Sequence, residues 1–110
     1  MPLIRVLDIE TSREDADEAE VIEIGSQDIE RDEQGFRLGL CRTDLIKPEQ
    51  PIDEVTMGIH HITNEMVEDA PPRKAVLPHY AGADIYAAHN AKFEMQFLNI
   101  KSPYICTYKV

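Results

Sequence analysis

The stretch VLDIETS at residues 6–12 is the starting point, because it predicts the central strand and contains two unexpected acids. Its apolar side chains belong to the run PLIRVLDIE at 2–10, which is typical of a strand buried in the interior of a sheet. Asp8 and Glu10 interrupt that run, although burial of an unpaired carboxylate is costly. Residues i and i+2 of a strand share a face and lie about 6.6 Å apart along the chain. We therefore expect Asp8 and Glu10 to project together from the C-terminal end of this strand.

Two neighbouring carboxylates repel each other, which raises the pKa of one of them. A hard divalent cation relieves the repulsion, because Mg²⁺ and Mn²⁺ prefer oxygen ligands. A pair of such ions about 3.5–4 Å apart is the usual device for cutting phosphodiesters. Alternatively, Asp8 and Glu10 end the strand and cap the following turn together with Thr11 and Ser12. The two acids by themselves leave both interpretations open.

The composition limits the class of protein. The 110 residues suit one domain spanning 1–110, and the formal charge of −10 argues against bulk attraction to nucleic acid or an anionic membrane. A nuclease that acts through bound cations stays compatible with that charge. No stretch approaches the ~20 apolar residues that span a bilayer, so no membrane partner is expected. Without a signal-peptide pattern, Cys41 and Cys106 are predicted to be reduced, mostly buried side chains of a cytoplasmic protein.

Apolar runs and alternating patterns predict four further strands, at 21–30, 36–48, 83–89 and from 103 onward. The turn sequence RDEQG at 31–35 joins the first two of them into a hairpin. Strands and helices in this order indicate a mixed α/β sheet. A right-handed crossover should place the strand at 83–89 parallel to the first strand and beside it.

The helical segments are predicted from caps and breakers. Residues 72–82 are expected to form a helix that Pro78 bends, and residues 90–99 a second helix with Asn90 as its N-cap. The segment 56–72 is expected to be a loop with one short helix, for which Thr63 and Asn64 are both possible N-caps.

A second group of candidate residues lies in AAHNAKFEMQFL at 87–98, where the strand at 83–89 meets its helix. If that strand lies beside the first, this junction lies near Asp8. Glu94 falls in the first helical turn, where the helix dipole favours negative charge, and could add a third carboxylate. Phe93 could stack on a base or sugar, although a lone phenylalanine is also typical of a core.

Five stretches resemble, in order and spacing, the DnaQ-like (DEDD) 3′→5′ exonucleases and in particular the exonuclease X branch: VLDIETS, IEIGS, MGIHHITNEMV, AAHNAKFEMQFL and ICTYKV. The resemblance covers nearly the whole chain. It implies an RNase H-like mixed sheet with flanking helices. It also implies removal of nucleotides from a nucleic-acid 3′ end with two Mg²⁺ or Mn²⁺ ions. We expect the substrate to be DNA rather than RNA, although the sequence does not distinguish the two.

The resemblance assigns roles to individual positions. Asp8, Glu10 and Glu94 match the catalytic acids that bind metal. Thr11 matches the position beside the terminal nucleotide, and His60 matches the histidine that lines the base and sugar pocket. The other residues implied in substrate binding are Met57, Thr63, Asn90 and Phe93.

Two departures from the family pattern bear on activity. Glu94 stands where aspartate is common, and its extra methylene moves the carboxylate by about 1.5 Å. The third motif, a histidine followed by an aspartate in a C-terminal helix, has no counterpart before Val110. We therefore expect an N-terminal portion of such an exonuclease, with the C-terminal helices, the general base and the last metal-binding aspartate absent and with little activity on its own.

Two alternatives stay open. The chain could be a non-catalytic RNase H-like binding or assembly module, whose exposed apolar surface would be covered by a partner or by a second copy in a homodimer. It could also be a nuclease of another RNase H-like class, such as a ribonuclease H or a resolvase. The stretches HNAKFE and GIHHIT favour the exonuclease.

Overall fold

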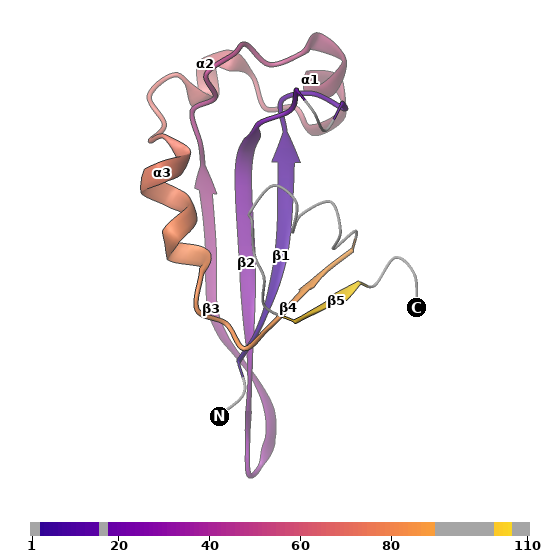
Figure 1. Cartoon of the computed structure of the whole chain (residues 1–110), viewed down its shortest axis with the longest axis vertical. Helices are drawn as coiled ribbons and strands as arrows, with labels where there is room; N and C mark the ends of the chain where they lie inside the picture. The colour runs from indigo at the N-terminus through magenta and orange to yellow at the C-terminus, as the bar shows by residue number, and fades with distance from the viewer. Residues whose placement is uncertain (1–2, 16–17, 90–102, 107–110) are drawn as a thin grey trace.

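A computed structural model of the chain describes residues 3–15, 18–89 and 103–106. These residues form a five-stranded sheet in the order β3-β2-β1-β4-β5 (Figure 1). The strands are β1 (Leu3–Thr11), β2 (Val21–Asp32), β3 (Gly35–Leu45), β4 (Ile85–Ala88) and β5 (Tyr104–Cys106). The pairs β1–β2 and β2–β3 are antiparallel, and the pairs β1–β4 and β4–β5 are parallel. The predictions of a mixed sheet, of the hairpin and of the fourth strand beside the first are confirmed.

One face of β1 is buried and the other is not. Leu7 and Ile9 are buried, whereas Val6 and Asp8, which alternate with them, are exposed. The expectation of a strand buried on both faces is therefore wrong. The period of two along a strand explains the outcome, because it places the acids on the accessible face without any cost of burial at Asp8.

The buried face of the sheet packs against a short helical segment. Here the chain makes one turn of α-helix, α3 (Arg73–Val76), and continues as a 3₁₀ turn, η1 (Leu77–Tyr80). Val76 and Tyr80 join Leu7 and Ile9 in the main core cluster. The predicted bend at Pro78 is thus a change from α to 3₁₀ geometry, because proline fits the start of a helical turn but cannot donate inside one. Gly82, with φ +96°, turns the chain toward β4.

Two helices, α1 (Glu54–His60) and α2 (Asn64–Val67), lie beyond the end of the sheet at which β1 finishes (Figure 1). Thr63 caps α2, because its hydroxyl accepts from the Met66 N–H at 3.3 Å. Asn64 instead accepts from the Ile52 N–H at 2.8 Å. The expectation of a loop with one short helix is wrong for α1. A small apolar cluster holds both helices to the sheet, and its buried members are Ile22, Ile52, Ile62 and Val67.

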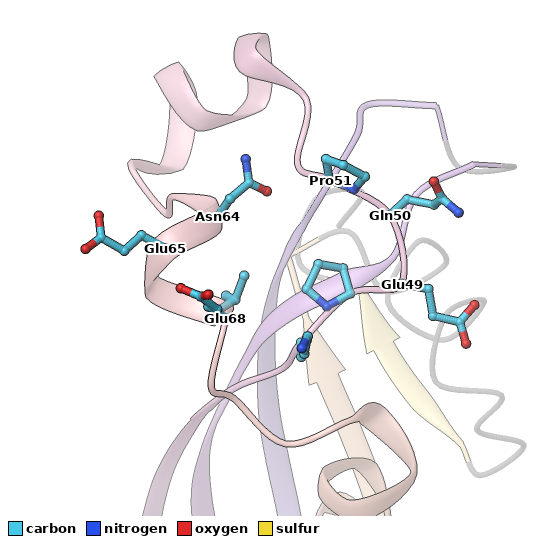
Figure 2. Close-up of a pocket in the computed structure, with 9 residues that line it drawn as sticks. Glu49, Gln50, Pro51, Asn64, Glu65 and Glu68 are labelled. Atoms are coloured by element: carbon cyan, nitrogen blue, oxygen red, sulfur yellow. The ribbon is translucent and has the colours of Figure 1, made fainter.

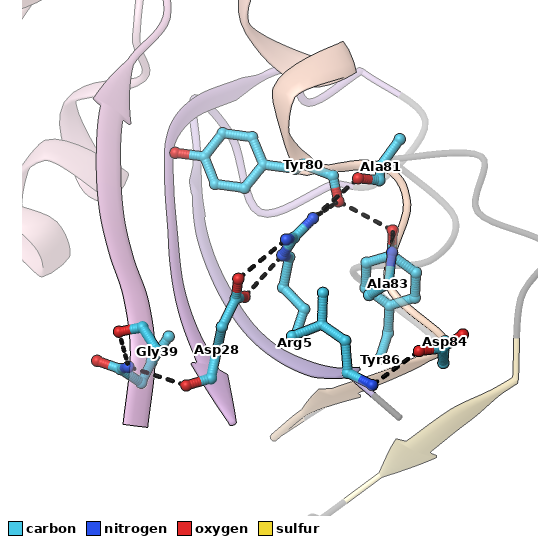
Figure 3. A network of polar contacts seen from close by, with 10 residues as sticks. Arg5, Asp28, Gly39, Tyr80, Ala81, Ala83, Asp84 and Tyr86 are labelled. Atoms are coloured by element: carbon cyan, nitrogen blue, oxygen red, sulfur yellow. Dashed lines mark hydrogen bonds and ion pairs between the residues drawn. The ribbon is translucent and has the colours of Figure 1, made fainter. Parts of the chain in front are cut away.

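A buried polar network fixes the position of β4 (Figure 3). The Arg5 guanidinium donates from Nε and Nη2 to the two carboxylate oxygens of Asp28, at 2.7 and 3.0 Å. Its Nη1 donates to the carbonyl oxygens of Tyr80 and Ala81, at 3.1 and 2.9 Å. The Tyr86 hydroxyl, on β4, donates to the same Tyr80 carbonyl at 2.9 Å. The network therefore joins β1, β2, η1 and β4 at one point.

The two cysteines differ from their predicted environment. Cys41 is exposed on β3, an edge strand, and Cys106 is half-buried on β5. The expectation that both are mostly buried is wrong, because strands at the edges of a sheet leave side chains accessible. Neither cysteine forms a disulfide within the described residues. In the same part of the chain, no helix has the length and apolar character needed to cross a membrane.

Candidate active site

The candidate site lies at the C-terminal end of β1. Asp8 and Glu10 alternate with the buried Leu7 and Ile9 and therefore share the opposite face of the sheet, as predicted. Asp8 is exposed and Glu10 is half-buried. Burial, followed by the negative charge of Asp8, raises the pKa of Glu10 above its ordinary value. The folded chain thus holds two carboxylates in electrostatic conflict.

Glu23 is a third acid at this place that the sequence analysis did not single out. It lies on β2 directly opposite Glu10 in the antiparallel pairing, and its charge contributes to the raised pKa of Glu10. The stretch IEIGS contained the signal, because residues directly opposite each other in an antiparallel pair have their side chains on the same face. To place Glu23 opposite Glu10, one has to know that β2 pairs with β1 and in which register.

His60, at the end of α1, connects that helix to the end of β1. Its Nδ1 lies 3.0 Å from the Ile62 backbone nitrogen and accepts from that N–H. The proton of the neutral ring is therefore on Nε2, which lies 3.0 Å from the Thr11 carbonyl oxygen and donates to it. A positive charge on the His60 ring lowers the pKa of Glu10, in the opposite sense to burial and to Asp8. His60 thus joins the end of α1 to the end of β1, next to Glu10.

A cavity of about 250 Å³ opens beside these residues. Glu10, Thr11 and His60, all predicted site residues, line it together. The other residues that line it are Arg13, Glu14, Thr56 and Ile59. The cavity thus combines the carboxylates of Glu10 and Glu14, the guanidinium of Arg13 and the apolar side chain of Ile59.

Two further predicted substrate-binding residues lie outside this cavity. Met57 is half-buried and packs against the small apolar cluster beneath α1 and α2, and the Thr63 hydroxyl caps α2. Asn90, Phe93 and Glu94 lie outside the described residues. Their predicted roles, and the predicted approach of Glu94 to Asp8, stay predictions.

The donor set at the end of β1 fits divalent cations in its chemistry. Asp8 and Glu10 offer carboxylate oxygens, which Mg²⁺ and Mn²⁺ prefer. Burial is the largest cause of the raised pKa of Glu10, and the repulsion by Asp8, which a cation would relieve, adds to it. Within residues 3–15, 18–89 and 103–106, no group of three or more His, Cys, Asp or Glu side chains is placed to hold a metal ion.

A larger groove, of about 580 Å³, lies elsewhere (Figure 2). The loop Glu49–Pro51 forms one side, and Asn64, Glu65 and Glu68, on or next to α2, form the other. None of the predicted site residues lines it. Lys47 also lines this groove, so both hollows combine acidic side chains with one lysine or arginine.

Comparison with known families identifies the class of protein. The sequence profile of the RNase T exonuclease family matches residues 6–103. The chain therefore belongs to the RNase T/DnaQ-like exonuclease family. Its five-stranded mixed sheet is the sheet of the RNase H-like exonuclease fold.

Individual relatives agree with this class. The chain is 34% identical over 109 residues to "Exodeoxyribonuclease 10" of Escherichia coli strain K12, a match that spans 98% of this chain and 46% of that protein. It is 38% identical over 98 residues to the PolC-type DNA polymerase III of Thermotoga maritima, a match that spans 86% of this chain and 7% of the polymerase. The chain thus spans about half the length of the first relative and a small part of the second.

Solved structures show the same fold. "Exonuclease X in complex with 5′ overhanging duplex DNA" superposes with a TM-score of 0.79 and 33% identity, over 94% of this chain and 59% of that one. E. coli Exonuclease I in complex with a dT13 oligonucleotide superposes with a TM-score of 0.73 and 13% identity, over 89% of this chain and 23% of that one. The second likeness concerns the fold alone.

Proposed function

We propose that the chain is part of a 3′→5′ exonuclease that hydrolyses the terminal phosphodiester of a nucleic acid, DNA in preference to RNA, with two Mg²⁺ or Mn²⁺ ions. The observation that carries the proposal is the pair of acids, Asp8 and Glu10, on one face at the end of the central strand, with the pKa of Glu10 raised. Membership of the exonuclease family supports it. The relative of known structure that is 33% identical is in complex with DNA.

In this proposal the chain's own residues divide the work. Asp8 and Glu10 bind the cations, and Glu94 supplies a third carboxylate to them. Thr11 and His60 line the cavity that receives the terminal nucleotide. His60 connects the end of α1 to the end of β1 through its hydrogen bond with the Thr11 carbonyl oxygen, next to Glu10. When bound, the cations supply activation of water and stabilisation of the leaving oxygen.

The family's third motif supplies a general base, and these 110 residues contain no match to it. Loss of a general base typically lowers a rate by about 10²–10⁴. We therefore propose that this polypeptide, assayed alone, degrades DNA slowly. Its compartment in the proposal is the cytoplasm, in which unpaired cysteines are the rule.

The test uses single-stranded DNA labelled at its 5′ end, with Mn²⁺ and a high concentration of the chain. We expect slow stepwise shortening from the 3′ end that stops in chelator and with Asp8→Asn. Glu65→Gln, an equal loss of charge on α2, is the matched control and should leave the rate unchanged. Shortening from the 5′ end, or a rate insensitive to Asp8→Asn, would contradict the proposal.

Metal binding provides a readout that does not depend on turnover. Paramagnetic Mn²⁺ should broaden the backbone amide signals of Asp8 and Glu10 at concentrations that leave Glu65 unaffected. Asp8→Asn should remove the broadening at Glu10. Absence of selective broadening in the unmodified chain would count against the metal site, even if the rate assay detected no degradation of DNA.

A second candidate function is a non-catalytic binding or assembly module that forms a homodimer. The observation that favours it is the exposure of Phe36, Leu38 and Leu40, whose side chains are 69%, 74% and 62% exposed on β3. Large apolar side chains gathered on an accessible strand are typical of surfaces that bind protein. The whole-molecule prediction below tests this candidate.

A further inference from the structure

The cavity beside Glu10 contains a basic side chain that the proposed function has not yet used. Arg13 lines this cavity together with Glu10, Thr11 and His60. The chain carries a net charge of −10, and both proposed metal ligands at the site are acids. A polyanionic substrate that approaches this end of β1 therefore needs positive charge from the cations or from the protein. Among the described residues that line the cavity, Arg13 is the only one with a basic side chain of the arginine or lysine type.

The backbone that presents Arg13 is firmly held. Ser12, immediately before it, is buried, and its carbonyl oxygen accepts from the Asp53 N–H at 2.9 Å and from the Thr56 hydroxyl at 2.8 Å. The Arg13 carbonyl oxygen itself accepts from the Thr11 hydroxyl at 2.9 Å. The first residues after β1 are thus hydrogen-bonded to α1 and to β1. These bonds fix the position of the Arg13 backbone next to the cavity.

The guanidinium of Arg13 is available for a ligand. Three arginines of the chain are neutralised by carboxylates, in the pairs Arg5–Asp28, Arg37–Glu30 and Arg42–Asp44. Among the described residues Arg31 and Arg73, like Arg13, form no ion pair, but neither lines this cavity. Within the described residues, Arg13 has no carboxylate at ion-pair distance, although Glu14 and Asp15 follow it in sequence. A guanidinium presents five donors in a planar fork that matches a phosphate group.

We propose that Arg13 binds a backbone phosphate of the nucleic-acid strand whose 3′ end occupies the cavity, and so acts as a substrate-binding residue. The inference rests on the proposed function. In it, Arg13 attracts and positions the strand while Asp8 and Glu10 hold the cations. The exposed Ile59 side chain on the cavity wall offers an apolar contact for a sugar or a base. It has no polar group with which to bind a phosphate.

The test is equilibrium binding of a fluorescent single-stranded oligonucleotide in Ca²⁺ over a range of salt concentrations. Arg13→Gln should weaken binding by about tenfold, the loss expected for one charge-assisted contact. It should also reduce the slope of log affinity against log salt by about 0.7, the value for one phosphate contact on a single strand. Arg73→Gln, the same change at an exposed position on α3, is the control and should alter neither quantity. Arg13→Lys should keep the slope, because it keeps the charge.

Oligonucleotides with one neutral methylphosphonate linkage localise the contact. The unmodified chain should lose affinity at one linkage near the 3′ end, and Arg13→Gln should be insensitive to substitution of that same linkage. Equal effects of Arg13→Gln and Arg73→Gln on affinity and slope would overturn the inference while leaving the proposed function intact. If the unmodified chain binds no DNA at all, the proposed function fails and this inference fails with it.

Discussion

Glu10 is the residue at which folding and the proposed function oppose each other. Burial and the charge of Asp8 raise its pKa, so its ionised form is less stable in the folded chain than in water. A carboxylate whose pKa is higher in the folded state than in the unfolded state destabilises the fold once the pH exceeds both values. Near neutral pH the ionised Glu10 carboxylate therefore lowers the stability of the folded chain, and a bound cation would offset this effect.

This conflict predicts opposite effects of one substitution with and without metal. In chelator at pH 7, Glu10→Gln should melt at a higher temperature than the unmodified chain, because the repulsion with Asp8 disappears. At a Mn²⁺ concentration of 100 times Kd, the unmodified chain should gain about 2.7 kcal/mol of unfolding free energy and the variant should gain much less. Differential scanning calorimetry measures both, with Glu65→Gln as the control. An equal gain in the variant would exclude Glu10 as a ligand.

At the scale of elements, the Arg5–Asp28 pair connects strands that are distant in sequence. Arg5 lies on β1 and Asp28 on β2, and the guanidinium also satisfies two carbonyls at the end of η1 (Figure 3). Both side chains of the pair are buried, so removal of one partner leaves an unpaired buried charge. The same residues hold β4 beside β1.

We expect Arg5→Met to lower the unfolding free energy by about 3–5 kcal/mol, the usual cost of breaking a buried ion pair. The double variant Arg5→Met with Asp28→Leu should recover part of the loss, because no carboxylate remains unpaired. Arg37→Met, which breaks the exposed pair with Glu30, should cost less than about 1 kcal/mol. Urea denaturation followed by circular dichroism distinguishes the three. A loss at Arg5 no larger than at Arg37 would show that the network contributes little.

A second connection between elements predicts pH dependence. Asp44 on β3 accepts from Arg42 Nε at 2.7 Å and from the Tyr80 hydroxyl on η1 at 2.6 Å, and these bonds lower the pKa of Asp44 below its ordinary value of 3.8. A lowered pKa stabilises the fold above the unfolded-state value, and this contribution is lost as the pH falls through the folded-state value. The affected window thus lies below about pH 4.

In that window Asp44→Asn should weaken the dependence of the unfolding free energy on pH. Tyr80→Phe removes one of the two donors and should produce a smaller change in the same direction, together with a loss of about 1 kcal/mol at neutral pH. Urea midpoints at several pH values between 5 and 3 provide the comparison. Curves parallel to that of the unmodified chain would mean that Asp44 titrates normally.

At the scale of the whole molecule, β3 forms one edge of the sheet and exposes Phe36 and Leu38, two residues apart and therefore on one face. Edge strands with exposed apolar side chains favour pairing with another chain. We expect the 110-residue chain to self-associate at micromolar concentration in sedimentation-velocity runs. Leu38→Lys should shift the population toward the monomer, whereas Val55→Lys, an equally drastic change on the exposed side of α1, should not. A monomer at all concentrations would remove the support for a homodimer.

Much of the fold could be predicted from local patterns. The apolar run around Asp8, the turn at 31–35 and the short apolar strand around Tyr86 each carry their signal within a few residues. The helix α1 was missed because its sequence contains Gly58 and few strong helix formers, and its stability comes from contacts such as that of Thr56 with Ser12. The alternating pattern predicted the strand at β3, but only the structure shows that its apolar residues Phe36 and Leu38 are exposed at a sheet edge.

The sequence by itself determined that Asp8 and Glu10 share a face, because the two-residue period of a strand is a local property. It also determined that the fourth strand lies parallel to the first and beside it, through the handedness of the crossover. Only the tertiary structure decided that Glu23 lies opposite Glu10, that the His60 ring binds the end of β1 and that Arg13 lines the same cavity. These positions depend on which segments distant in sequence pack together, and the pattern within any one segment does not contain that information.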